Sequence, residues 1–457
     1  MAMGRAQWGS KLGFVMAASG SAVGLGNLWK FPYITWENNG GAFVIVYLAA
    51  VLILGLPIMM AEILVGRRAQ QSAVPAFEAL GGRGWSIVGW LGVLAGAVIL
   101  SYYTVIAGWS ISSFVQCLGW SFNGYAAPSA DAFDKFLANG PLQLGLTAVF
   151  TILTAVIVYR GIGGGIELAT KIMMPVLIII LLYLVGTALT MEGRGQALSM
   201  IFTPNFSELP PQGVLLAVGQ AFFSLSLGLG AMVAYGSYIG KKESIFGSAL
   251  WVVILDTGFA LLACIAMFTI IFSVPDLQGR LSGSTVGMLF ITLPDLFYTK
   301  MPGGAVLAPA FFILVGFAAL SSTISLGEVV TSLMIDRRGW SRPKAVIVCS
   351  GVIFVGSIFA ALSLGAVDSL SSFELFEGKK GVLSNLDHLA ANWLLPLGGL
   401  GTTVFVGWFL GKENIREELG FTRQGVYFAM FLWSLRVIAP IAILILLGFV
   451  ISGRDFS

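Results

Sequence analysis

Charge is scarce in this sequence, and that scarcity excludes most protein classes. Only 10% of the 457 residues are charged, whereas 57% are hydrophobic, and the mean hydropathy is +0.91. A soluble globular chain carries about 25% charged residues, so that class is excluded. The apolar residues form continuous runs rather than alternating ones, which excludes a transmembrane β-barrel. The composition therefore predicts an all-α, polytopic membrane protein.

Histidine and cysteine are also rare. His388 is the only histidine, and Cys117, Cys264 and Cys349 are widely spaced in apolar surroundings. This pattern provides no metal cluster or disulfide framework, and it weakens any proton relay built on histidine. The sequence also lacks a nucleophile and base at helical spacing, a repeated filter motif and a ring of pore charges. We therefore expect neither an enzyme nor a channel.

Long apolar runs predict eleven transmembrane helices, because about 20 apolar residues cross a bilayer. They lie at roughly 10–36, 41–66, 86–123, 142–159, 166–190, 213–239, 244–274, 304–335, 343–365, 386–411 and 424–452. No cleavable signal is expected before the first run. Lysine and arginine are concentrated in the loops on the N-terminal side of the membrane. The positive-inside rule then predicts a cytoplasmic N-terminus and an external C-terminus.

The first run contains Gly20-Ser21-Ala22-Val23-Gly24-Leu25-Gly26-Asn27 at the depth of the membrane centre. Backbone that leaves the helix inside a membrane must be satisfied by protein, water or a ligand. We predict a broken helix whose free carbonyls and amides bind something. The alternative is a small-residue packing face, which explains Gly20 and Gly24 but not Asn27 beside Gly26.

The sixth run repeats this anomaly. Gln220 to Gly230 again places glycines and hydroxyls at mid-membrane. Two interrupted helices five crossings apart indicate an inverted repeat with a binding site where the breaks meet. We predict one transporter domain, 1–457, with repeats 10–190 and 213–411 and an additional helix at 424–452.

Two other segments suggest moving parts. Residues 275–303 are long enough to form a lid over the external mouth. The fifth run begins with several glycines, Gly165 among them, and contains Pro175. Glycine and proline weaken a helix, so the cytoplasmic end of this one is expected to unwind and admit water. Ordinary packing around a proline kink is the alternative.

The chain resembles the neurotransmitter:sodium symporter family, in particular its bacterial amino-acid transporters. The resemblance spans all ten crossings of the repeat. It is carried by Ser21-Ala22-Val23-Gly24-Leu25-Gly26-Asn27 with Phe31-Pro32, Asn39-Gly40-Gly41-Ala42-Phe43, Tyr102-Tyr103, Phe222-Phe223-Ser224-Leu225-Ser226-Leu227-Gly228 and Ala318 to Thr323.

The resemblance implies two Na⁺ sites built from oxygen ligands, which suit a hard cation. The first is expected from the carbonyls of Gly20, Val23 and Ala318 and the hydroxyls of Ser321 and Ser322. The second is expected from Ala22, Asn27, Ser224 and Asp256, completed by the substrate carboxylate. For Ser321 and Ser322 alone, helix-to-helix hydrogen bonds are the commoner explanation.

Asp256 departs from the family pattern, where asparagine is common, and Ala260 replaces the serine of chloride-dependent members. Asp256 supplies a fixed negative charge beside the cation, so chloride is not expected as a cofactor. The alternative is a buried aspartate that is hydrogen-bonded to Tyr47, Gln220 or Ser224.

The resemblance also implies a substrate site. Gly24 stands where monoamine carriers have an aspartate, so a ligand that brings both charges fits better. Half-helix N-termini attract its carboxylate and C-termini its ammonium. The site residues are expected to be Ala22, Gly24, Leu25, Gly26, Tyr103, Phe223, Ser224, Ser226, Leu229, Ser322 and Leu326. This apolar lining implies hydrophobic L-amino acids, aromatic and branched aliphatic, tryptophan and leucine included.

Gates follow from the same resemblance. The outer gate is expected from Lys30, Asp387 and Phe223, and the inner gate from Arg5, Asp336, Trp8 and Tyr238. Snorkelling is the alternative for charges near helix ends. Glu62, deep in the second run, is expected to accept hydrogen bonds from unwound amides of both broken helices. Glu328 and Arg436 receive no role from the sequence.

Together these features predict a sodium-coupled symporter of the bacterial inner membrane. A proton-coupled amino-acid permease of a related fold is the rival, with Asp256 as its only titratable group at the ion positions. The expected partners are a hydrophobic amino acid, two Na⁺ ions and the lipid bilayer, with no nucleic acid. The sequence does not predict an oligomeric state.

Overall fold

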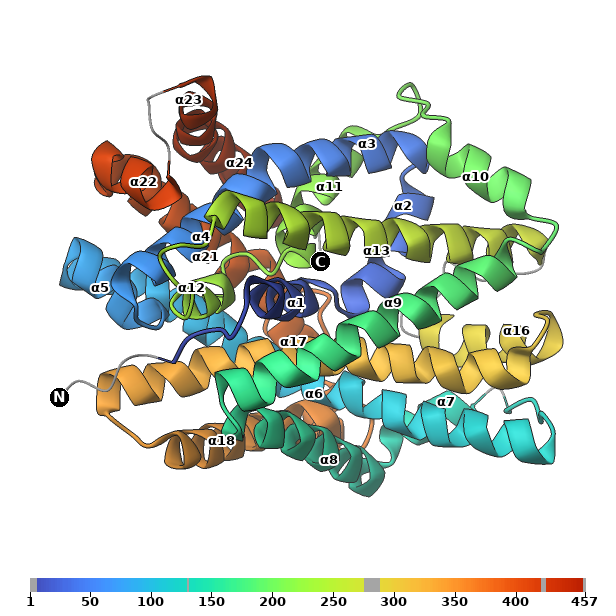
Figure 1. The fold of residues 1–457 in the computed structure, drawn as a ribbon. Coiled ribbons are helices and arrows are strands. Elements are labelled where there is room, and N and C mark those ends of the chain that lie inside the picture. Colours follow the sequence, from blue (N-terminus) through green and yellow to red (C-terminus); the bar gives the residue numbers. More distant parts are fainter. Residues whose placement is uncertain (1–5, 130, 275–287, 421–424, 455–457) are drawn as a thin grey trace.

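A computed structural model describes residues 6–129, 131–274, 288–420 and 425–454 of the chain. Those residues form helices and turns, with no β-strand among them, which agrees with the predicted all-α class. Figure 1 shows α13 (Ile245–Ser273), α9 (Leu168–Ala188), α17 (Gly304–Arg338) and α6 (Ser86–Asn123) running side by side across the molecule.

The remaining helices complete the chain in order, η denoting π-helical or 3₁₀ turns. The first half adds α1 (Lys11–Ala22), η1 (Gly26–Lys30), α2 (Phe31–Glu37), α3 (Gly41–Ala50), η2 (Val51–Gly55), α4 (Leu56–Ala69), α5 (Ala73–Gly81), η3 (Arg83–Trp85), α7 (Ala132–Ala138), α8 (Gly140–Tyr159), η4 (Ile162–Glu167) and α10 (Arg194–Phe202). The second half adds α11 (Pro211–Ser224), α12 (Ala231–Gly236), η5 (Met288–Thr292), α16 (Leu293–Thr299), α18 (Arg342–Leu362), α19 (Asp368–Ser371), α20 (Val382–His388), η6 (Leu389–Leu394), α21 (Leu395–Val404), η7 (Phe405–Phe409), α22 (Lys412–Leu419), α23 (Val426–Trp433), η8 (Ser434–Ile438) and α24 (Ala439–Ile451).

Nine helices in the described residues are long and apolar enough to cross a membrane. A tenth span is formed by the bent pair Lys11–Ala22 and Gly26–Glu37. The sixth predicted run instead forms two shorter helices, α11 and α12, separated by 225–230. The predicted count of eleven crossings is therefore not confirmed, although ten runs coincide with observed spans.

The first predicted break is confirmed. Ser10 caps α1 by accepting a hydrogen bond from the Gly13 amide at 3.0 Å, and the helix ends where Val23 turns to an extended ψ of 104°. The chain then re-enters a helix at Gly26, bent by 57°. Because these segments are largely buried, the groups that leave the helix face protein rather than lipid.

The second predicted break is confirmed as well. Between α11 and α12, the backbone φ is positive at Ser226 (53°), Gly228 (77°) and Gly230 (69°). Glycine adopts such angles without strain, which explains two of the three residues. A Cβ added to Gly228 would lie 2.3 Å from the Leu395 carbonyl oxygen, so the break is also tightly packed.

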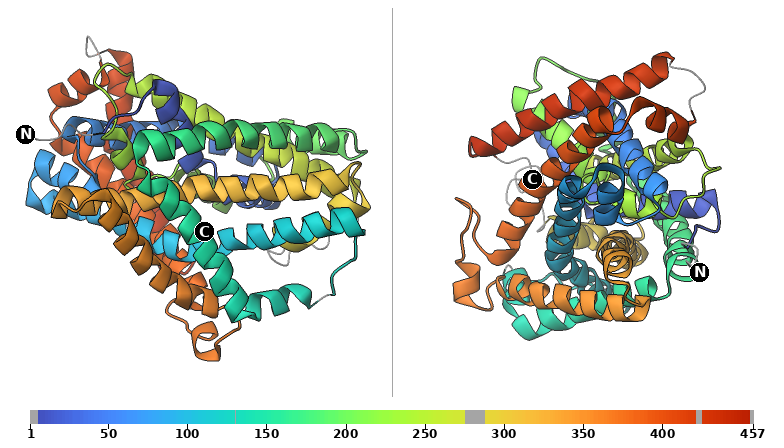
Figure 2. Two further views of the ribbon diagram at one scale, coloured as in Figure 1. Left: turned by 60° about the horizontal axis from the view of Figure 1, so that its bottom comes forward. Right: turned by 90° about the vertical axis from the view of Figure 1, so that its left-hand side faces the viewer.

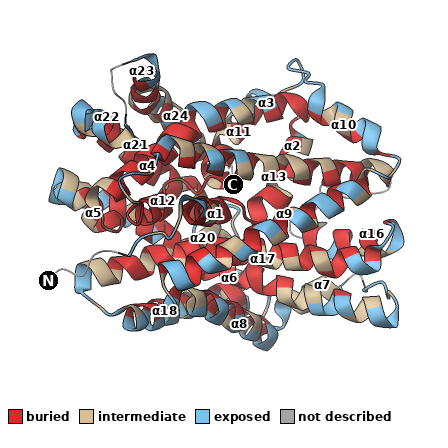
Figure 3. Ribbon diagram, in the orientation of Figure 1, coloured by how far each residue is buried: buried red, intermediate tan, exposed pale blue. Residues whose placement is uncertain are grey.

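Burial places both breaks at the centre of the molecule. Figure 3 shows α1 and α12 almost entirely buried, whereas α8, α10 and α18 expose one face. In the right-hand view of Figure 2, α17 is seen nearly end-on with the other helices around it. A membrane protein that is apolar outside and interrupted inside is suited to hold a polar ligand within a bilayer.

The predicted moving parts have mixed outcomes. In this structure, α9 is helical from Leu168 to Ala188 with Pro175 inside it, so unwinding stays a prediction. Gly165 packs closely, since a Cβ there would lie 2.1 Å from the Ile157 carbonyl oxygen. Residues 275–287 of the predicted lid lie outside the described residues, and 288–303 include η5 and α16.

Candidate functional site

The two helix breaks meet, and serines connect them. The Ser226 hydroxyl donates to the Ser21 carbonyl at 2.8 Å, which links the break of α11–α12 to the end of α1. Ser322 from α17 approaches the same carbonyl at 3.5 Å, and the Ser21 hydroxyl donates to Ser325 at 2.7 Å. Three segments that are far apart in sequence thus share one carbonyl oxygen.

A fully buried carboxylate lies beside this junction. Asp256, with 0% of its surface exposed, accepts hydrogen bonds from the Asn27 amide at 2.7 Å and the Ser224 hydroxyl at 2.7 Å. The Tyr47 hydroxyl donates to Ser224 at 3.3 Å. In the described part of the chain, Asp256 has no lysine or arginine partner. A buried anion without a cation is costly, so this cluster is suited to a bound positive ion.

The other predicted ion site also comes together. Ser321 and Ser322 both donate to the Ala318 carbonyl, at 3.0 and 3.2 Å. A Cβ on Gly20 would lie 3.0 Å from that of Ser321, so the α1 backbone touches α17 here. Val23 is fully buried at the adjacent break. Both hydroxyls therefore donate within their own helix in this structure. Of the helix-to-helix bonds that the sequence left open as the alternative, the described residues show the 3.5 Å approach of Ser322 to the Ser21 carbonyl.

Several of the predicted substrate residues lie close to Gly24. The Leu25 amide donates to the Tyr103 hydroxyl at 3.2 Å. A Cβ on Gly24 would lie 3.0 Å from the Ser322 Oγ and 3.2 Å from the Tyr103 hydroxyl, and one on Gly26 would lie 2.7 Å from the Phe223 ring. Ala22, Ser224, Leu229 and Leu326 are all buried. The bare backbone at Gly24 and Gly26 thus faces hydroxyl and aromatic groups.

The outer gate residues flank this region. The Lys30 ammonium lies 4.6 Å above the centre of the Phe223 ring, a cation–π contact. Asp387 accepts a hydrogen bond from the Tyr102 hydroxyl at 2.7 Å. The predicted pairing of Lys30 with Asp387 stays a prediction.

On the opposite side, the N-terminal segment is docked onto α12. The Trp8 indole donates to the Tyr235 carbonyl at 3.0 Å, and its amide donates to the Tyr238 carbonyl at 3.1 Å. Asp336 accepts from the Ser72 amide at 2.6 Å. Arg5, its predicted partner, lies outside the described residues. Trp8 and Tyr238 are thus in contact through their backbones. Their role in an inner gate stays a prediction.

Glu62 behaves as predicted toward one of the two breaks. Its Oε1 accepts from the Gly228 amide at 2.7 Å. Within the described residues, its Oε2 has no hydrogen-bond partner, so a bond to the first break is not seen. One carboxylate oxygen thus fixes the second break from α4.

Sequence reasoning missed several polar contacts. Glu328 forms an ion pair with Arg342 at 2.7 Å and accepts from the Tyr238 hydroxyl at 2.6 Å. Glu167 accepts from the Gly9 amide at 2.7 Å, which ties the N-terminal segment to η4. The side chain of Arg436 reaches the Gly407 carbonyl. Glu328 and Glu167 both lie in apolar runs of the sequence. An acidic residue in such a run was the one sequence signal that could have indicated a buried polar contact.

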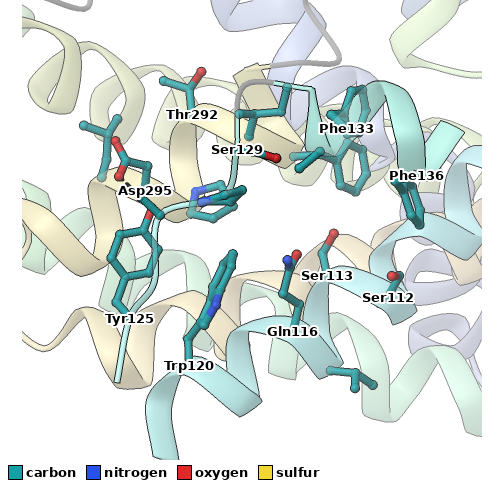
Figure 4. A pocket seen from close by; sticks show the side chains of 18 of the residues that line it. Ser112, Ser113, Gln116, Trp120, Tyr125, Ser129, Phe133, Phe136, Thr292 and Asp295 are labelled. Atoms are coloured by element: carbon teal, nitrogen blue, oxygen red, sulfur yellow. Dashed lines mark hydrogen bonds between the residues drawn. The ribbon is translucent and has the colours of Figure 1, made fainter. Parts of the chain in front are cut away.

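A separate cavity of about 790 Å³ lies away from the breaks, between the end of α6, α7 and α16. Figure 4 shows Trp120 and Gln116 from α6 facing Phe133 of α7 across it, with Asp295 from α16 at one side. The Tyr125 hydroxyl donates to Asp295 at 2.7 Å. Burial and this contact raise the pKa of Tyr125 above its usual range. The sequence did not predict this cavity.

An all-helical membrane protein whose buried polar centre lies at two interrupted helices has the architecture of a secondary transporter. Residues 5–137 and 125–454 match the family described as "Sodium:neurotransmitter symporter family". The chain belongs to this family.

Individual relatives agree. The chain is 35% identical over 443 residues to the uncharacterized sodium-dependent transporter YhdH of Bacillus subtilis, covering 96% of each. It is 26% identical to the human sodium- and chloride-dependent GABA transporter 2 over 91% of this chain and 76% of that one. The crystal structure of MhsT in complex with L-phenylalanine matches with 41% identity and a TM-score of 0.86, covering 97% of this chain and 99% of that one. This protein is therefore a sodium-dependent transporter and not an enzyme, as the sequence predicted.

Proposed function

We propose that this protein imports hydrophobic L-amino acids together with Na⁺, by alternating access. The observation that supports this most is the buried group of Asp256, Asn27 and Ser224 beside two helix breaks. An anionic, oxygen-rich centre that has no lysine or arginine partner among the described residues is suited to Na⁺. That MhsT was crystallised with L-phenylalanine supports the same substrate class here.

Two Na⁺ ions would be transported with each substrate. One would bind the carbonyls of Gly20, Val23 and Ala318 with the hydroxyls of Ser321 and Ser322, once these hydroxyls rotate away from Ala318. The other would bind Asp256, Asn27, Ser224 and the Ala22 carbonyl, next to the carboxylate of the substrate. The fixed charge of Asp256 would replace chloride.

The substrate would lie along Gly24. Its carboxylate would meet the Leu25 and Gly26 amides and the Tyr103 hydroxyl, where the partial positive charge of a helix N-terminus is available. Its ammonium would meet carbonyls near Ala22, Phe223 and Ser226. An apolar side chain would contact Leu229, Leu326 and Ser322. Because no carboxylate occupies position 24, an amine without its own acid group would bind poorly.

Access would alternate between two gates. Phe223 with Lys30 and Asp387 would close the external side, while Trp8, Tyr238, Asp336 and Arg5 would close the cytoplasmic side. The repeats 10–190 and 213–411 would move relative to each other, with the helix at 424–452 outside the repeat. The N-terminus would be cytoplasmic and the C-terminus external, in the bacterial inner membrane.

Uptake into liposomes tests this function. The purified full-length protein would be reconstituted, and uptake of each of the twenty labelled amino acids would be measured with an inward Na⁺ gradient. We expect accumulation of leucine, phenylalanine and tryptophan at least tenfold above that of glutamate or lysine. Replacing external Na⁺ with K⁺ should abolish it.

The same liposomes distinguish this symporter from the rival, a proton-coupled amino-acid permease. An inward proton gradient without Na⁺ should drive no accumulation if Na⁺ is the coupling ion. Accumulation driven by protons alone would instead support a proton-coupled permease. Accumulation of charged amino acids in preference to apolar ones would contradict the proposed substrate class.

A further inference from the structure

An apolar groove runs along the outer surface of the protein between α4, α23 and the start of α13. It encloses about 1060 Å³, and its walls are almost entirely carbon. Leu52, Met60, Phe246, Met430 and Trp433 line it, and four of these five side chains are about half exposed or more. In a membrane protein, such a surface faces lipid rather than water.

Two π-helical turns form the floor of the groove. η2 and η8 contact each other, and the Ser434 hydroxyl donates to the Ile53 carbonyl at 2.5 Å. A π-helical turn releases a carbonyl from the regular helix ladder, and Ser434 satisfies it. This hydrogen bond holds η2 and η8 together at the floor of the groove. The enclosed volume shows that the surface is concave rather than flat.

A cavity of about 760 Å³ lies next to this groove, and Arg67, Arg68, Lys241 and Lys242 line it together with Glu243, Glu417 and Glu418. The two are adjacent because Ser244 lines the cavity and Phe246, two residues later, lines the groove. Arg67 is paired with Glu418, and Arg68 is paired with both Glu417 and Glu418. Lys241 and Lys242 are exposed, and neither forms an ion pair with a carboxylate in the described part of the chain. We call Lys241 and Lys242 the lysine pair.

We propose that this groove and the lysine pair together bind one anionic glycerophospholipid, such as phosphatidylglycerol. One acyl chain would fill the groove, and the phosphate would contact the ammonium groups of the lysine pair. Charge supports this occupant, because the four cations that line the cavity outnumber its three carboxylates. Each lysine near an anionic headgroup favours binding over a zwitterionic lipid. The inference uses the cytoplasmic placement of the 240–244 loop, which belongs to the proposed orientation.

Such a lipid would support the transport site indirectly. Met60 lines the groove and lies two residues before Glu62 on α4. Glu62 holds the Gly228 amide of the second break. An acyl chain packed on Met60 would therefore restrain the helix that positions the break.

Lipid retention measured by native mass spectrometry tests this proposal. The full-length protein would be purified from mixed phosphatidylglycerol and phosphatidylcholine nanodiscs and released from them. We expect one retained phosphatidylglycerol in preference to phosphatidylcholine. In the variant K241Q/K242Q, that preference should fall about tenfold. R338Q/K344Q, which removes two exposed cytoplasmic cations elsewhere, should retain the preference.

A groove-filling variant tests the acyl-chain part separately. Ala429→Trp should lose both lipids, whereas Ile441→Trp, on an exposed face of α24, should keep them. Equal retention of the two lipids by the unaltered protein would overturn the proposal. So would unchanged retention in both K241Q/K242Q and A429W, or a change of oligomeric state in A429W without lipid loss. Because lipid binding is read without transport, failure here leaves the proposed substrate untouched.

Discussion

Three acidic residues in the apolar spans, Asp256, Glu328 and Glu62, have three different kinds of partner. Asp256 accepts hydrogen bonds from Asn27 and Ser224 and forms no ion pair with a basic residue among the described residues. Glu328 is neutralised by Arg342. Glu62 uses one oxygen to hold a backbone amide. A carboxylate in a bilayer is expensive in each case, so each must be matched by an ion, a base or peptide donors.

Replacing Asp256 tests its role as a fixed charge. Asp256→Asn keeps the hydrogen-bonding shape but removes the negative charge, so Na⁺ affinity should fall at least tenfold, equivalent to about 1.4 kcal/mol. Uptake by the unaltered protein should be the same in chloride and in gluconate. Uptake by the variant should be low in gluconate and recover partly in chloride. Asp368→Asn, at an exposed position in α19, serves as the control, and chloride dependence of the unaltered protein would contradict the prediction.

Glu62 should matter more for stability than for ion binding. Glu62→Ala removes the acceptor of the Gly228 amide, and an unsatisfied buried amide costs about 1–3 kcal/mol. Glu62→Gln retains one acceptor oxygen and should be milder. Thermal unfolding followed by intrinsic fluorescence in detergent would measure both. Equal unfolding temperatures for the alanine variant and the unaltered protein would refute the contact.

At the scale of elements, the two helix interruptions are built differently. The first uses an extended residue, Val23, and a π-helical turn, η1. The second uses positive φ angles at Ser226, Gly228 and Gly230. Both leave peptide groups outside the helix ladder, and side chains from α4, α6 and α17 satisfy several of them.

Gly228 is the position where the second break is most sensitive. An alanine there would adopt a left-handed backbone at a cost of about 1–2 kcal/mol, and its Cβ would collide with the Leu395 carbonyl. Gly228→Ala should therefore reduce Na⁺-driven uptake per molecule at least tenfold. Gly258→Ala in α13, where the added Cβ meets no atom within 4 Å, is the matched control. Full activity in Gly228→Ala would show that the break tolerates another geometry.

At the scale of the whole molecule, the proposed binding residues come from distant parts of the chain, including α1, α6, α11, α13 and α17, so a bound ligand would connect these parts. The N-terminal segment adds a further connection through Trp8 and Glu167. An ion can bind at such a junction only while the helices are assembled. Ion binding therefore raises the free energy of unfolding of the whole protein.

Exchanging Na⁺ for K⁺ should therefore destabilise the protein. At an Na⁺ concentration 100 times its dissociation constant, one ion adds about 2.7 kcal/mol to the free energy of unfolding. The unfolding temperature should rise with Na⁺ concentration by several degrees and stay constant with K⁺. In Asp256→Asn, the rise should be smaller. An identical response to both cations would argue against specific Na⁺ binding.

The sequence by itself determined the class of fold and the two helix breaks, because both are local properties. In lipid, the backbone N–H and C=O groups of a long apolar run find hydrogen-bond partners within the run itself only if it is helical. Glycines beside Asn27 and within 220–230 mark where a helix stops. Family motifs supplied the expected site residues, and the structure brings Asn27, Ser224 and Asp256 together.

Only the tertiary structure decided which polar groups meet. The sequence gives no sign that Ser21 pairs with Ser325, that Glu328 pairs with Arg342, or that Glu167 receives the Gly9 amide. The first and last of these contacts join residues more than 150 positions apart, and no local period records any of the three. They follow from how whole helices pack, since a buried polar group takes whichever partner that packing leaves within reach.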